Sequence, residues 1–117
     1  MATFGDFVRH RREELRQSDR RYSLRQVADR IGIQPSYLSK VERGEVAPPG
    51  EETIGRLADE LSVDRDTLLA LGGKVSTDLK ETIRRRPELF AQLIRELRDL
   101  PDQAVLRLVR EVRDGDW

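Results

Sequence analysis

The strongest constraint on the fold is a pair of short helical segments with a glycine between them. Ser23 is positioned to begin the first segment and Gly32 to end it, while Pro35 opens the second segment and Gly44 closes it. Two short helices that meet steeply need a small residue at their crossing and a turn that permits a positive φ angle. Ala28 meets the first requirement and Gly32 meets the second. The sequence therefore predicts two short helices that cross next to Gly32.

The second segment, residues 35–43, has two chemically different sides. Apolar residues of both segments are spaced to face a shared core, whereas the outward positions are polar or basic. A helix with core behind it and short polar and basic groups in front fits the major groove of duplex DNA. The core-facing residues are Val27, Ile31, Ile33, Leu38 and Val41, and the outward ones are Gln34, Ser36, Ser39, Lys40 and Arg43.

The remaining segments also have helical periodicity, and none alternates in the manner of a strand. Further helix starts are predicted near Thr3, at Glu51 and after Asp64. After Gly72-Gly73 the pattern changes to two or three amphipathic segments that start near Thr77, Pro87 and Pro101. The sequence predicts an all-α protein with one domain over residues 1–73 and a helical extension over residues 74–117.

The stretch SLRQVADRIGIQPSYLSKVERGE, followed by PPGEETIGRLADELSVDRDTLLAL, resembles the Xre family of helix-turn-helix regulators, which includes the lambdoid phage repressors. The likeness covers roughly residues 3–72. It implies a five-helix bundle of the lambda-repressor type whose third helix enters the major groove. It also implies that Leu38 and Val41 are core residues. The DNA-binding residues implied are Gln34, Ser36, Tyr37 and Lys40 in the groove, Ser39 and Arg43 at phosphates, and Arg25 and Gln26 beside them.

The sequence departs from this family at several positions. Gln34 stands where similar proteins have Ser or Thr, and Gln is a poorer N-cap, so DNA or water is expected to hold that helix end. Arg11 occupies a position that is often apolar. The loop after the first helix is longer than in the short phage repressors, and its Arg20 and Arg21 either touch the DNA backbone or lie in solvent. Tyr37 either packs beneath its helix or reaches thymine methyl groups.

Arg12 and Glu42 form a separate pair of candidates. In similar proteins an arginine of the first helix pairs with the glutamate that follows the recognition helix. A semi-buried pair would hold the helix angle, and this structural role is favoured over a direct DNA contact by Arg12.

The C-terminal extension carries a stripe of apolar residues at helical spacing. The stripe either covers the five-helix core or joins two copies of the chain, and its length favours self-association. The predicted dimerisation residues are Leu89, Leu93, Leu97, Leu100, Val105, Leu108 and Val112.

Charge and composition narrow the function. The net charge is zero, but residues 1–47 hold ten Lys or Arg against seven Asp or Glu, which suits a DNA-binding surface.

The chain has no cysteine and one histidine, so we expect no metal site, no cofactor and no disulfide. Ser36 and Ser39 have no histidine positioned by sequence to activate them, so an enzyme is not expected. No apolar run suggests a signal peptide or a membrane span, which favours a cytoplasmic protein.

These observations predict a sequence-specific regulator of transcription that binds double-stranded DNA. It is expected to be a repressor and to act as a homodimer on a palindromic operator. The alternative is an antitoxin-like or adaptor protein whose C-terminal helices bind a protein partner.

Overall fold

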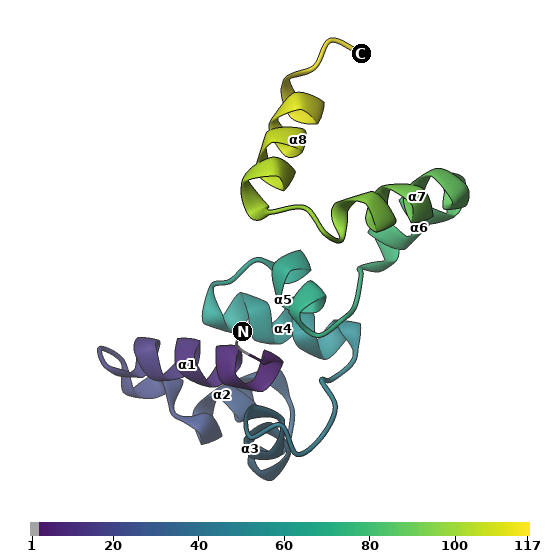
Figure 1. Cartoon of the computed structure of the whole chain (residues 1–117). Coiled ribbons are helices and arrows are strands. Elements are labelled where there is room, and N and C mark those ends of the chain that lie inside the picture. The colour runs from purple at the N-terminus through teal and green to yellow at the C-terminus, as the bar shows by residue number, and fades with distance from the viewer. Residues whose placement is uncertain (1–2) are drawn as a thin grey trace. The chain divides into compact units, whose positions relative to one another are not determined.

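The structure, a computed structural model, describes residues 3–117 and divides into two compact units. The first unit extends to Ser76 and the second spans Thr77–Trp117 (Figure 1). All regular elements between residues 3 and 117 are helices, and this part of the chain contains no strand, so the prediction of an all-α fold is confirmed. The first unit contains α1 (Phe4–Arg16), α2 (Leu24–Ile31), α3 (Pro35–Glu42), α4 (Glu51–Leu61) and α5 (Arg65–Leu71), and the second contains α6 (Thr77–Arg85), α7 (Pro87–Leu97) and α8 (Asp102–Asp114).

Side-chain caps begin three of the helices. Thr3 accepts a hydrogen bond from the Asp6 amide at 3.1 Å, and Ser23 accepts one from the Gln26 amide at 3.3 Å. Asp64 accepts one from the Thr67 amide at 2.9 Å. Each cap satisfies an amide that the first helical turn leaves unpaired, which explains why these three helices start at these positions.

The segment between α1 and α2 is more ordered than the predicted polar loop. A single 3-10 turn, η1, spans Arg20–Tyr22 and is capped by Asp19. The Arg21 side chain donates hydrogen bonds to Asp19 and, with the Arg21 amide, lowers the pKa of Asp19 to about 2. Because this pKa lies below that of an unfolded aspartate, the cap stabilises the turn above about pH 4 and is lost as the pH falls toward 2.

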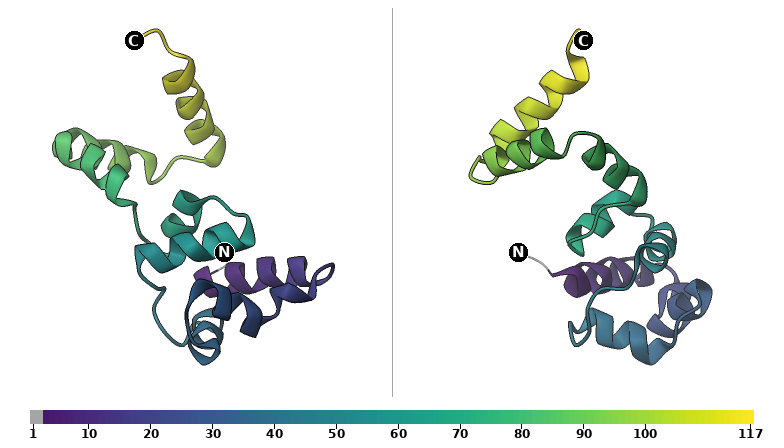
Figure 2. Two further views of the ribbon diagram at one scale, coloured as in Figure 1. Left: turned by 180° about the vertical axis from the view of Figure 1, so that it is seen from behind. Right: turned by 90° about the vertical axis from the view of Figure 1, so that its right-hand side faces the viewer.

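The core of the first unit receives apolar side chains from all five of its helices. In both views of Figure 2 these helices gather around one centre, with α3 at an edge of the unit. The residues that the sequence placed in a shared core, Val27, Ile31, Leu38 and Val41, are buried, and Ile33 packs against them from a half-buried position. The other buried members are Phe4, Val8, Ala28, Ile54, Leu57, Ala58, Leu61, Leu68 and Leu69.

The turn between α2 and α3 depends on the backbone conformation of Gly32. This residue has φ +78°, in the left-handed region, and the amide of Ile33 donates to the Ala28 carbonyl at 3.0 Å. Residues with a Cβ atom are strained in this region, whereas glycine is not.

We expect Gly32→Ala to lower the free energy of unfolding by about 1–2 kcal/mol through backbone strain. The nearest atom to the added methyl group would be the Arg56 guanidinium at 3.5 Å, so steric overlap adds nothing. Urea denaturation measures the change. Gly50→Ala is the control, because Gly50 has φ −71° and open space around it. Equal stability of the two variants would contradict the role assigned to Gly32.

The second unit contains no fully buried residue in its three helices. Its helix starts agree with the predictions near Thr77, Pro87 and Pro101. The predicted dimerisation residues divide into two groups. Leu97 and Val105 are half-buried within the chain, whereas the other five remain exposed, namely Leu89, Leu93, Leu100, Leu108 and Val112.

Candidate nucleic-acid interface

The exposed face of α3 is polar and basic. Ser36 and Lys40 are exposed, and Arg43 is exposed directly after the helix, so the three lie at intervals of four and three residues on one side. Leu38 and Val41 occupy the opposite side and are buried. Lys40 has no ion-pair partner among residues 3–117, and Arg43 lies 3.3 Å from Glu45 in an exposed pair. Exposed pairs of this kind are weak, so both cations are available to an anionic partner.

The N-terminus of α3 is open. Gln34 occupies the N-cap position with an exposed side chain that forms no capping hydrogen bond, and Pro35 follows at the first helical position. This agrees with the weaker capping expected of glutamine. Pro35 has no amide hydrogen and the Tyr37 amide donates to the Gln34 carbonyl at 3.0 Å, so the Ser36 amide is the one left for a partner at this helix end, where anionic groups are favoured.

Tyr37 and Ser39 lie at the border of this face. Both are half-buried, and the Tyr37 ring packs against the apolar core. This contact with the core agrees with the packing alternative for Tyr37, and a contact of Tyr37 with thymine methyl groups stays a prediction.

Arg25 and Gln26 are exposed in the first turn of α2. The backbone amide of Gln26 is bound by Ser23, but its side chain does not complete a capping box. The amide of Ser23 donates instead to the Arg20 carbonyl at 3.2 Å, because η1 places that carbonyl within reach. Ser23 therefore caps the helix without a return hydrogen bond from Gln26, and the Gln26 side chain lies outside the cap.

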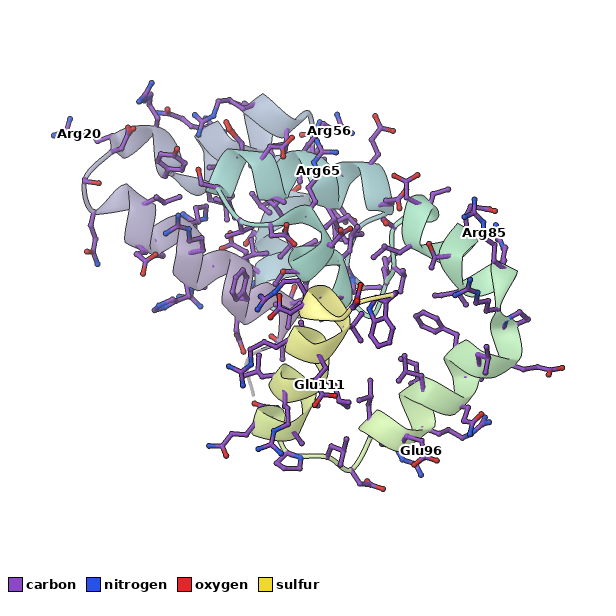
Figure 3. All side chains as sticks on the ribbon, turned by 90° about the horizontal axis from the view of Figure 1, so that it is seen from above. Arg20, Arg56, Arg65, Arg85, Glu96 and Glu111 are labelled. Carbon is purple, nitrogen blue, oxygen red and sulfur yellow. The ribbon has the colours of Figure 1, made fainter. Side chains whose placement is uncertain are left out.

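Basic residues of the loop differ in their surroundings. Arg21 is held by Asp19, with nitrogen–oxygen distances of 2.8–3.1 Å. Arg20 is exposed and lies at the outer edge of the first unit (Figure 3). Of the two, Arg20 is the residue whose side chain is left open to a partner.

Arg12 and Glu42 form a buried, two-pronged ion pair between α1 and the end of α3. Arg12 Nε lies 2.7 Å from Glu42 Oε2, and Arg12 Nη2 lies 2.9 Å from Glu42 Oε1. The two side chains are 4% and 3% exposed, so neither is accessible to DNA. Arg12 Nη1 also donates to the Tyr22 carbonyl at 3.2 Å. The hydrogen bonds that Arg12 donates to the Glu42 carboxylate raise the pKa of Arg12 above its ordinary value.

Two further residues, Arg11 and Gly5, form contacts between helices that the sequence did not predict. Arg11 Nε donates to the Leu61 carbonyl at 2.9 Å, so it binds the C-terminal end of α4. This contact explains why an arginine is tolerated at a position that is often apolar. Gly5 lets α1 approach the backbone of α3 at Val41 and Glu42. The sequence contains one indication of this close approach, which is the presence of a glycine in the first turn of an amphipathic helix.

Within residues 3–117 no group of three or more acidic or histidine side chains is arranged to hold a metal ion. None of the described helices has the length and apolar character that crossing a bilayer requires.

Comparison with known proteins gives the family of the chain. A family model described as a helix-turn-helix domain matches residues 3–71, which is more than half of the sequence, so the chain belongs to this helix-turn-helix family. The assignment to the Xre family in particular remains a prediction.

Three curated relatives carry similar sequences. The uncharacterized HTH-type transcriptional regulator RghRB of Bacillus subtilis (strain 168) is 34% identical over 88 residues, which cover 75% of this chain and 59% of that protein. Two uncharacterized HTH-type transcriptional regulators of Mycobacterium tuberculosis, from strains H37Rv and CDC 1551, are each 35% identical over 69 residues, covering 59% of this chain and 45% of those proteins. The match thus spans about half the length of these relatives. No solved structure matches the chain.

Proposed function

We propose that this protein is a sequence-specific regulator of transcription that reads the major groove of double-stranded DNA with α3. The observation that carries the proposal is the exposed face of Ser36, Lys40 and Arg43 on a helix whose opposite side is buried. Membership of the helix-turn-helix family and the naming of three relatives as transcriptional regulators support it. No catalytic role is proposed.

Each residue of the interface has a proposed role. Gln34, Ser36 and Lys40 contact base edges, with Tyr37 at the side of the same face. Ser39 and Arg43 contact phosphates, and Arg25 and Gln26 do so from the start of α2. Arg12, Glu42, Ala28 and Gly32 keep α2 and α3 at a constant angle without touching DNA.

The proposed assembly is a homodimer joined through residues 75–117, which acts as a repressor on a palindromic operator. A single small module buries little surface on DNA, so specific binding generally requires two half-sites. Two-fold symmetry then places the half-site centres about 34–36 Å apart, or a multiple of that distance.

The exposed apolar residues of the second unit favour a second candidate function. Leu89, Ile94, Val109 and Val112 are each more than half exposed, which is unusual for a surface that has no partner. An antitoxin-like or adaptor protein would use this surface to bind a different protein. A purified protein that shows no salt-dependent shift of any genomic DNA fragment would favour this second candidate.

We expect Lys40→Ala to weaken specific binding by about 1–3 kcal/mol, because it removes a base contact. Arg43→Ala should weaken specific and nonspecific binding alike and reduce the salt dependence, because it removes a phosphate contact. Fluorescence anisotropy across a salt titration, on a site selected from random DNA, measures both effects.

Lys80→Ala is the matched control, because Lys80 is exposed on α6 and has no proposed DNA contact. It should leave the affinity and the salt slope unchanged. Wild-type binding by both Lys40→Ala and Arg43→Ala would show that this face does not meet DNA.

A further inference from the structure

One side of α8 is apolar and uncovered. Val105, Leu108, Val109 and Val112 follow the spacing of a single helix face, here termed the α8 face. Val105 is half-buried, and the other three are exposed. α6 packs against α7, whereas α8 makes no contact of that extent with any helix between residues 3 and 117.

A helix of this length needs a packing partner. α8 has 13 residues, and isolated helices shorter than about 12–15 residues are marginal in water. Most helical stability in proteins comes from covering the apolar face. The α8 face is therefore expected to be covered when the protein acts.

The charges beside the α8 face indicate what covers it. Asp102 and Arg113 lie on one flank, at opposite ends of the helix, because about three full turns separate them. When two copies of α8 run antiparallel with Leu108 and Val109 at the centre, Asp102 lies on the same flank as Arg113 of the second copy, about 3 Å from it along the helix axis. A parallel pair would instead place each end beside the like-charged end of its neighbour.

We propose that the α8 faces of two copies pack against each other in this antiparallel arrangement and form the contact that joins the dimer. The inference rests on the dimer of the proposed function and names the helix responsible. Two copies of one face satisfy two-fold symmetry, since each residue meets the same partner on both sides. The existing Arg113–Asp114 pair is 65% exposed on both side chains, so it can give way to the contact between copies.

The first test compares two equally exposed apolar residues on different helices. Val112 on α8 is 65% exposed and Leu89 on α7 is 66% exposed, so lysine at either position leaves the folded chain intact. Val112→Lys in the full chain should raise the dimer dissociation constant at least about tenfold in sedimentation equilibrium, because it places charge in the apolar contact. Leu89 is among the dimerisation residues predicted from the sequence, but the proposed contact lies on α8 alone, so Leu89→Lys should leave the constant within about threefold of wild type. Equal effects, or a larger effect of Leu89→Lys, would overturn the inference.

The second test exchanges the charges that define the antiparallel arrangement. Asp102→Arg and Arg113→Asp should each weaken the dimer about threefold to tenfold, and the double variant should return to within about threefold of wild type. Each substitution also opposes the helix dipole, and those effects add. A double variant weaker than either single variant would therefore mean that the two residues act only within their own helix.

The same samples separate this inference from the proposed function. Monomeric Val112→Lys should keep salt-dependent binding to nonspecific DNA while losing affinity for a palindromic site. A wild-type protein that binds DNA as a monomer at micromolar concentration would refute the α8 contact and leave the DNA-binding function standing. A wild-type dimer that binds no DNA would refute the function and leave the α8 contact to be judged by the charge exchange.

Discussion

Replacement of Arg12 by methionine should lower the free energy of unfolding by about 3–5 kcal/mol, because it leaves the Glu42 carboxylate buried without its cation. Arg12 donates two hydrogen bonds to the Glu42 carboxylate in the interior, and it also donates one to the Tyr22 carbonyl. Small domains are stable by only about 5–15 kcal/mol, so this loss is a large share of the total. Thermal and urea denaturation followed by circular dichroism measure it.

The double variant Arg12→Met/Glu42→Leu distinguishes the destabilisation caused by an unpaired buried charge from that caused by loss of the other interactions of Arg12. Apolar residues of similar volume in place of both partners remove the unpaired charge, so the double variant should be more stable than Arg12→Met alone. The Tyr22 carbonyl still loses its donor, which limits the recovery.

Arg16→Met is the matched control on the same helix. Arg16 is 53% exposed and lies 3.8 Å from Glu13, so its loss should change stability by less than about 0.5 kcal/mol. An Arg12→Met protein that unfolds at the wild-type temperature would show that the pair does not hold α1 and α3 together.

Replacement of Gly5 by alanine should destabilise the protein by about 1–3 kcal/mol, although alanine is ordinarily the better helix former. The added methyl group would lie 2.6 Å from the Glu42 carbonyl oxygen and closer still to that of Val41. Both obstructing atoms belong to the backbone, so α1 and α3 must move apart. Chemical denaturation measures the loss, and weaker binding to a selected DNA site should accompany it because α3 shifts.

Gly55→Ala is the control, since Gly55 is also a buried glycine within a helix. Its added methyl group would meet the end of the Arg65 side chain, with the nearest atom at 3.2 Å. Arg65 is 59% exposed and pairs with Asp59. A flexible side chain can move, so Gly55→Ala should be neutral or stabilise the protein by up to about 1 kcal/mol. Similar losses from both substitutions would mean that the approach of α1 to α3 is not what Gly5 provides.

The sequence was sufficient to predict the features that depend on residues close to one another along the chain. The caps at Thr3, Ser23 and Asp64 and the left-handed Gly32 were all predictable, because each involves atoms no more than five residues apart. Helical periodicity identified which side of α3 is buried for the same reason. The polar and basic residues of the candidate DNA-binding face followed directly from that assignment.

The tertiary structure alone decided the features that join distant parts of the chain. Arg11 binds a carbonyl 50 residues away, and Arg12 meets Glu42 across 30 residues in a fully buried pair for which the sequence suggested only partial burial. The close approach of Gly5 to two carbonyls of α3 also appears only in the structure. The same is true of the division of the C-terminal apolar residues into half-buried and exposed groups. Such features depend on the positions and angles at which whole helices pack. Periodicity tells which side of a helix is apolar, but it carries no information about which atoms of another helix that side will meet.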